Sequence, residues 1–188
     1  MWVKHISRTS KAYYLHFKTS TGGKPSYYFS MDPRGPLAAT IPDGYEIYEN
    51  VGGQVFLRKK TTPIIRPEEL AMVEAALSKH GEPWQYRAEV KKKTVVVFEA
   101  AEMNGLDEIF IHFRGSSRSR EEKLSHANYV AVLRFTLADK ATRAFLAERF
   151  CFRGSVDDWI TIGGPGGLAE LLRQFVKHLG QNSFYDLF

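Results

Sequence analysis

The sequence has very little cysteine and no long apolar run. Its single cysteine, Cys151, excludes an internal disulfide bond and any zinc site built from several cysteines. The longest uncharged apolar runs, such as residues 129–133, are far shorter than the roughly 20 residues that a membrane-spanning helix needs. The N-terminal residues also lack the continuous apolar stretch of a signal peptide. We therefore expect a cytoplasmic protein with no membrane segment.

Motifs of well-known catalytic chemistry are absent as well. The six histidines show neither H-x-x-x-H nor H-E-x-x-H spacing, and no serine lies in a G-x-S-x-G context. The glycine run at 163–167 precedes a predicted helix but matches no phosphate-binding loop, so we expect a flexible connector there. These absences predict no cofactor and no metal, and they favour a protein without catalytic activity.

Positive charge and aromatic rings are concentrated in the first third of the chain. Residues 1–66 contain ten Lys or Arg and four acidic residues, whereas residues 67–188 contain sixteen and seventeen. The first third thus carries +6 in a chain whose formal net charge is +5. A local excess of basic groups beside exposed rings is typical of surfaces that bind nucleic acid or another polyanion.

Alternating apolar and polar residues predict a series of antiparallel hairpins. Aromatic and β-branched residues flank loops that are rich in glycine, lysine or polar residues, which is the usual pattern of paired strands. The predicted hairpins are 13–18 with 27–31, 45–49 with 54–58, 84–90 with 94–100, and 129–137 with 144–152, and shorter strands are predicted at 108–113 and 160–162.

Two segments have apolar residues at helical spacing. The first, residues 67–80, begins with a proline and ends before Gly81, although Arg66 is a poor N-cap residue. The second, residues 168–179, has a wide apolar stripe. We expect the apolar tail at 183–188 to dock on the core. Antiparallel hairpins and a meander packed with two main helices predict the α+β class.

A passage of linker-like composition near residues 115–123 indicates where the chain divides. We predict a hairpin-rich α+β subdomain at 1–100, which carries the basic aromatic face, and a connecting region at 101–127. A β-meander plus the C-terminal helix follows at 128–188. The same pattern also suits a single domain of this length.

The leading functional prediction is a non-catalytic protein that binds nucleic acid or another polyanion on a basic, aromatic sheet face. Basic groups neutralise phosphates, and flat rings stack on unpaired bases. In the competing interpretation, the rings of the first hairpin are core and the lysines form a solvated rim. The predicted contact residues are Lys11, Tyr14, His16, Lys18, Lys24, Tyr28, Arg58, Lys59 and Lys60.

Two alternative functions stay open. One is a hydrolase or phosphoryl-transfer enzyme centred on Asp157 and Asp158, because adjacent carboxylates can hold a divalent cation. Consecutive strand residues point to opposite faces, so these carboxylates converge only if they lie in a turn. The other alternative is a protein-interaction scaffold or homodimer that uses Trp2, Trp84 and the C-terminal aromatic residues. Further candidates for the enzyme are Arg149, Arg153 and His178, with His112 as an alternative histidine.

Three groups of passages suggest kinship with other proteins. They are Tyr13–His16 with Gly23–Pro25, Ile41–Glu49 with Gln54–Arg58, and Glu148–Trp159 with His178–Gly180 and Ser183–Tyr185. Together they resemble a group of uncharacterised bacterial proteins over nearly the whole chain. This resemblance implies a bacterial cytoplasmic setting and no particular activity, cofactor or site residue. The first hairpin alone is also similar to the strand-rich arm-binding modules of phage-type integrases.

Overall fold

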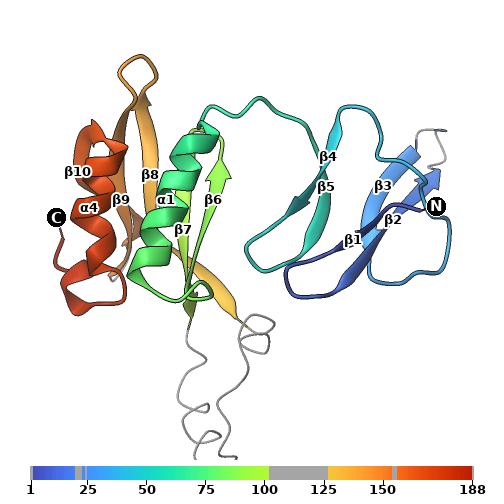
Figure 1. Ribbon diagram of the computed structural model, residues 1–188, viewed down its shortest axis with the longest axis horizontal. Helices are drawn as coiled ribbons and strands as arrows, with labels where there is room; N and C mark the ends of the chain where they lie inside the picture. The colour runs from blue at the N-terminus through green and yellow to red at the C-terminus, as the bar shows by residue number, and fades with distance from the viewer. Residues whose placement is uncertain (1, 20–22, 24, 102–126, 154–155, 188) are drawn as a thin grey trace, which may run out of the picture. The chain divides into compact units, whose positions relative to one another are not determined.

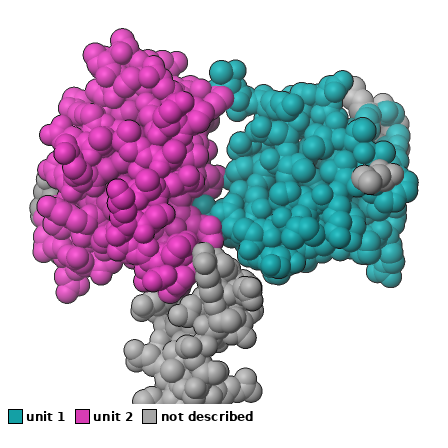
Figure 2. Space-filling view, in the orientation of Figure 1, with its two compact units in different colours: residues 1–62, 116–126 teal, residues 63–115, 127–188 magenta. Residues whose placement is uncertain are grey.

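A computed structural model of the chain describes residues 2–19, 23, 25–101, 127–153 and 156–187 (Figure 1). The chain divides into two compact units, which we treat separately (Figure 2). The described residues of unit 1 lie within 2–62, and those of unit 2 lie within 63–101 and 127–187. Within these described residues, antiparallel sheets and two α-helices confirm the predicted α+β class.

Unit 1 is built from two β-layers. The first layer is a three-stranded antiparallel sheet in the order β1 (Lys4–Ile6), β2 (Ala12–Thr19) and β3 (Pro25–Ser30). The second is the hairpin of β4 (Tyr45–Glu49) and β5 (Val55–Lys59). Both hairpins agree with the prediction, whereas the short strand β1 was not predicted.

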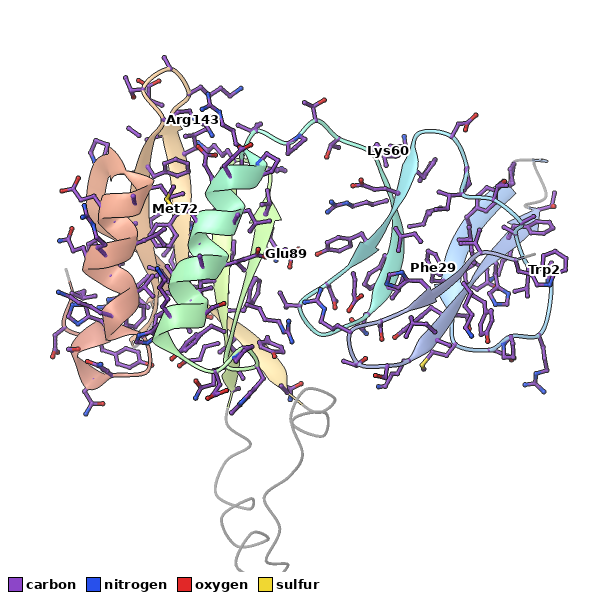
Figure 3. All side chains as sticks on the ribbon, in the orientation of Figure 1. Trp2, Phe29, Lys60, Met72, Glu89 and Arg143 are labelled. Carbon is purple, nitrogen blue, oxygen red and sulfur yellow. The ribbon has the colours of Figure 1, made fainter. Side chains whose placement is uncertain are left out.

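The inner face of the three-stranded sheet faces the β4–β5 hairpin. Successive strand residues point to opposite faces, so Leu15 points inward while its neighbours on β2 point outward. Leu15 is fully buried, and Val55 from β5 is 4% exposed. Figure 3 shows Phe29 directed into the space between the layers. These apolar side chains form the core of unit 1.

The loop after β3 returns to the sheet and completes its edge. The Phe17 N–H donates to the Pro36 carbonyl at 3.2 Å, and the Ala38 N–H donates to the Leu15 carbonyl at 2.8 Å. These bonds give partners to backbone groups of β2 that the short strand β1 does not reach. Sequence pattern did not reveal this pairing, because a proline- and glycine-rich passage does not have the alternation of a strand.

Unit 2 is a five-stranded antiparallel meander with helices on one face (Figure 1). The helices are α1 (Pro67–His80) and α4 (Leu168–Phe175). Short 3₁₀ turns follow at Val176–His178 and Asn182–Phe184. The strand order is β10 (Val156–Gly167), β9 (Ala144–Arg153), β8 (Asn128–Asp139), β7 (Thr94–Ala101) and β6 (Tyr86–Lys91).

The core of unit 2 lies between the helices and the sheet. The helical stripe that the sequence predicts is buried, and the tail docks as expected because Phe184 is 4% exposed within this core. Burial of such apolar side chains is the main favourable term in folding. The most buried members of the core are Val73, Val95, Val97, Leu133, Phe135, Phe145, Ala147 and Phe175.

The N-terminus of α1 compensates for its poor N-cap residue. The Glu69 carboxylate accepts the Arg66 N–H at 2.8 Å, which is the bond that the third helical residue makes back to the N-cap residue in a capping box. The same carboxylate accepts Arg143 Nε at 2.8 Å from the β8–β9 turn. Glu69 therefore joins the start of α1 to a distant hairpin, although it is only 8% exposed.

The glycine run at 163–167 is not a flexible connector. It forms the last part of β10, where Gly163 pairs with Ala147 and Gly166 pairs with Phe145 across irregular register shifts. The Phe175 ring of α4 occupies the space that a side chain at Gly163 would need. The glycines therefore let the helix approach the strand closely. The second helix is also shorter than predicted, because α4 ends at Phe175.

The boundary between the two units differs from the predicted one. The chain divides between Thr62 and Pro63, whereas β7 and β8 on either side of the predicted connecting region pair in one sheet. Residues 102–126, which include the predicted strand 108–113, lie outside the described residues. The pairing of β7 with β8 keeps both strands in unit 2. Linker-like composition cannot predict this, because it contains no information on which strands pair.

Candidate nucleic-acid interface

The outward face of the three-stranded sheet brings together several of the residues predicted from sequence. Register pairs Lys4 with Tyr14 across β1 and β2, and it pairs His16 with Tyr28 across β2 and β3. Lys18 follows two residues beyond His16 and so lies on the same face. Figure 3 shows Trp2 on the side of this sheet away from β4 and β5. We define the aromatic-basic face as Trp2, Lys4, Tyr14, His16, Lys18 and Tyr28.

The cations on this face lie against the rings. Lys4 Nζ is 5.8 Å from the centroid of the Tyr14 ring, and Lys18 Nζ is 4.9 Å from that of Tyr28. Both distances are within the range of a cation–π contact. The two lysines are about 13 Å apart along β2, since Lys4 lies opposite Tyr14 and each strand residue advances about 3.3 Å. The face therefore presents cations at both ends of a row of rings.

His16 lies on this face between Tyr14 and Lys18, but it is covered and is not an exposed contact residue. It is 3% exposed, and its Nε2 lies 2.9 Å from the Asp32 carbonyl oxygen. Because a carbonyl only accepts, Nε2 must carry the proton of this bond. The imidazole stacks on Tyr28 with centroids 5.2 Å apart and an interplanar angle of 18°. His16 thus orients the Tyr28 ring, which is a correction to its predicted role in direct contact.

Three acidic residues of unit 1, namely Asp32, Glu46 and Glu49, are paired with arginines. Glu49 accepts Arg8 Nε at 2.7 Å and lies 3.1 Å from His5 Nε2. Burial opposes ionisation of Glu49, but hydrogen bonds from Arg8 and His5 outweigh it and lower its pKa. No described strand residue that points outward from this sheet is acidic. The lysines of this face are therefore not neutralised by neighbouring carboxylates.

Asp32, which follows β3, forms an ion pair with Arg34. Its carboxylate accepts Arg34 Nε at 3.0 Å and Arg34 Nη2 at 3.0 Å. These hydrogen bonds lower the pKa of Asp32 to about 2. The carboxylate thus remains charged, and its charge is met by Arg34 instead of a lysine of the aromatic-basic face.

Exposed apolar surface accompanies the cations. Trp2 is 59% exposed and Tyr28 is 38% exposed, and Ile6 on β1 is 55% exposed. Scattered single apolar residues need no explanation, but here they occur on one sheet face with two lysines. This combination of flat rings and positive charge can stack on unpaired bases and neutralise phosphates.

The remaining predicted basic residues do not join this face. Arg58 lies on the outward face of the other layer, where its guanidinium is 4.4 Å from the Tyr48 ring and its Nε donates to Glu46 at 2.7 Å. Lys59 has the opposite orientation on the same strand, and Lys60 follows its end. The two layers pack face to face, so Arg58 and Lys18 point to opposite sides of unit 1. This separation corrects the prediction of one shared surface.

Lys11 and Lys24 complete the predicted set. Lys11 lies in the tight turn before β2, where its N–H donates to Ser7 Oγ at 3.2 Å. It is therefore at the end of the strand opposite to Lys18. Lys24 lies outside the described residues. Conversely, Lys4 and Trp2 were not among the predicted contact residues; the alternation Trp2, Lys4, Ile6 would have indicated them had β1 been predicted.

The adjacent carboxylates Asp157 and Asp158 do not converge. Both lie in β10, opposite Phe152 and Cys151 respectively, and no turn interrupts the strand there. Strand alternation therefore sends the two side chains to opposite faces of the sheet. Asp158 Oδ1 accepts the N–H of Trp159 at 2.7 Å, as an aspartate with a local backbone bond does. The geometry that the enzymatic alternative requires is absent at these two described residues.

The other candidate catalytic residues have structural partners or lie outside the described part. Arg149 is 4% exposed and donates from Nε to the Leu187 carbonyl at 2.9 Å and from Nη2 to the Tyr185 carbonyl at 3.0 Å. Arg149 therefore connects the C-terminal tail to β9 by two hydrogen bonds. His178 Nδ1 lies 2.9 Å from Ser183 Oγ, five residues away in the same tail. The side chain of Arg153, and all of His112, lie outside the described residues.

The aromatic residues of the scaffold alternative belong to different units. Trp2 belongs to unit 1 and Trp84 to unit 2, where the Trp84 carbonyl accepts Tyr129 Oη at 2.7 Å. In the described part of the tail, Phe184 is buried and Tyr185 is 53% exposed. Within the described ranges there is no group of three His, Cys, Asp or Glu able to hold a metal ion. No described helix is long and apolar enough to cross a membrane.

Comparison with protein-family models, curated proteins and solved structures finds no match. Only the residues and their geometry therefore indicate a function for this chain.

Proposed function

We propose that this protein is a non-catalytic nucleic-acid-binding protein that uses the aromatic-basic face of unit 1. The observation that carries the proposal is the outward row of Lys4, Tyr14, Tyr28 and Lys18, on a sheet face where no described strand residue is acidic. Trp2 adds the most exposed ring. A sheet face of this composition suits a short stretch of unpaired nucleotides.

Each residue has a separate part in this binding. Lys4 and Lys18 neutralise phosphates at the two ends of the face, while Trp2 and Tyr28 stack on bases. Lys18 Nζ now lies over the Tyr28 ring, so binding exchanges this cation–π contact for a phosphate contact and frees the ring. His16 stacks against the Tyr28 ring and orients it.

The proposal is tested by fluorescence anisotropy with labelled single- and double-stranded oligonucleotides over a range of salt concentrations. Substituting Lys4→Glu and Lys18→Glu together removes two phosphate-binding cations. We expect the slope of log K against log salt concentration to fall by about 0.7 for each of these cations on a single strand. Trp2→Ser is expected to weaken binding by about 1–3 kcal/mol, because a stacking ring is removed.

The matched control is Lys92→Glu with Lys140→Glu. It makes the same change in net charge, but both lysines lie in exposed hairpin turns of unit 2. Binding should be unchanged apart from a small, salt-sensitive loss. If wild-type protein binds no oligonucleotide at low salt, or if the control weakens binding as much as the face variant does, the proposal is wrong.

A further inference from the structure

A second surface feature lies on unit 2, between its two helices. A groove of about 590 Å³ runs between α1 and α4. Its floor is apolar, and Met72 on α1 is 41% exposed there. Figure 3 shows Met72 in the space between the two helices. The apolar lining residues are Met72, Ala75, Ala76, Ala169, Leu172 and Val176.

The charged residues at the rim of this groove are all basic. Lys79 contributes from α1, Arg173 from α4, and Lys177 from the turn that follows α4. Among the described residues, no acidic side chain lines the groove. His80, which completes the lining, has its Nε2 2.9 Å from the Leu179 carbonyl oxygen and is thereby held as a donor. The three cations can therefore meet a negatively charged ligand.

Helix stability accounts for only part of this arrangement. Basic residues near helix C-termini are favourable, because they interact with the negative end of the helix dipole, and this explains Lys79 and Arg173 on their own helices. It does not explain why Met72, Ala75 and Ala169 remain exposed to solvent between them. A folded unit gains by covering such a floor, and the basic rim specifies the charge of what covers it.

We propose that this groove binds an acidic amphipathic helix of another protein. Such a helix lays its apolar stripe in a hydrophobic groove, and its flanking carboxylates would meet Lys79, Arg173 and Lys177. From Met72 to Lys79 the groove spans about 10 Å, which matches two turns of helix. Small side chains at Ala75, Ala76 and Ala169 leave room for the backbone of the partner helix. Most of the lining is exposed, so the groove does not enclose a small molecule as a ligand pocket does.

The test uses the full chain and a fluorescein-labelled synthetic helix of about four turns, with leucine at i, i+3, i+4 and i+7 and flanking glutamates. Two comparison peptides replace the glutamates by lysines or place a proline in the centre. We expect only the unbroken acidic helix to bind. Arg173→Glu with Lys177→Glu should weaken that binding by at least about tenfold. The same double variant should gain affinity for the lysine peptide, since the charges are then complementary again.

Further measurements locate the site and check the fold. The NMR signal of the Met72 methyl group should shift when the acidic peptide is added to the wild-type protein. Lys92→Glu with Lys140→Glu, which changes the net charge equally away from the groove, should bind the peptide within about twofold of wild type. Circular dichroism and a thermal melt confirm that each variant remains folded.

Several results would overturn the inference. These are absence of binding to the acidic helix, equal binding of the proline-containing peptide, and a Met72 signal that does not move. A salt-resistant dimer that Met72→Glu dissociates would show that a second copy covers the groove. If the NMR signal of the Met72 methyl group shifts on adding sodium dodecanoate but not on adding the peptide, the groove binds fatty acids instead.

Discussion

At the residue scale, buried polar side chains of this protein mostly join segments that are far apart in sequence. Glu69 connects the N-terminus of α1 to Arg143 in the β8–β9 turn, and Arg149 connects β9 to the C-terminal tail. His16 connects β2 to the loop after β3 through the Asp32 carbonyl. Each is hydrogen-bonded, as buried polar groups must be if their desolvation is to be offset.

Substituting Glu69→Gln should destabilise unit 2 in a pH-dependent way. Burial opposes ionisation of Glu69, but hydrogen bonds from Arg143 and the Arg66 N–H outweigh it and lower its pKa. A lowered pKa in the folded state contributes stability that is present above the unfolded value of about 4.3 and is lost as pH falls through the folded value. At pH 7 we expect the free energy of unfolding to drop by about 2 kcal/mol.

Urea unfolding between pH 7 and pH 3 measures this effect. The difference between wild type and Glu69→Gln should stay constant down to about pH 5 and shrink below the unfolded pKa. Glu74→Gln is the matched control, because Glu74 is an exposed acid on the same helix. A difference that does not depend on pH would contradict the role of the ionised carboxylate.

At the element scale, the close packing of α4 against β10 depends on the glycine run. Phe175 is 1% exposed, and its ring fills the position that a Cβ at Gly163 would occupy. Gly164 has a φ of 94°, a conformation that residues with side chains rarely adopt. A strand with larger residues here would hold the helix farther from the sheet and leave space in the core.

Gly163→Ala should therefore cost about 1–3 kcal/mol of stability, because the Phe175 ring must move out of a well-packed position. Gly167→Ala is the comparison, since an added Cβ there meets nothing within 4 Å. Its effect is expected to stay within about 0.5 kcal/mol. Thermal and urea unfolding of both variants gives the two values, and equal costs would refute the packing argument.

At the scale of the whole molecule, the described residues of each compact unit form a hydrophobic core of their own. Leu15 is fully buried in unit 1, and Leu133 is fully buried in unit 2. The aromatic-basic face belongs to unit 1 and the helix groove to unit 2. The two proposed binding surfaces therefore depend on different cores.

A pair of core substitutions tests this separation. Leu133→Ala should lower stability by about 2–5 kcal/mol but leave oligonucleotide affinity nearly unchanged below the melting temperature. Leu15→Ala should weaken oligonucleotide binding as well, because Leu15 lies directly beneath Tyr14 and His16 on β2. Anisotropy titrations and melts of both variants provide the comparison. Loss of affinity in Leu133→Ala equal to that in Leu15→Ala would show that the binding face requires unit 2.

Local sequence pattern predicted the α+β class, the hairpins and the bounds of α1 because these depend on neighbours along the chain. Alternation in β2 likewise placed Tyr14, His16 and Lys18 on one face. The pattern did not predict β1, whose three residues are too few to show a period. It also misjudged the glycine run, because the reason for those glycines is a phenylalanine of the following helix.

The sequence by itself determined which residues alternate, where α1 begins and ends, and that positive charge gathers in the first third. Only the tertiary structure decided that Arg58 points away from Lys18, that Asp157 and Asp158 face opposite ways, and that His16 is covered. These outcomes depend on how layers and strands pair over long separations in the chain. Periodicity assigns a side chain to a face of its own element, whereas packing between elements decides whether that face meets solvent or core.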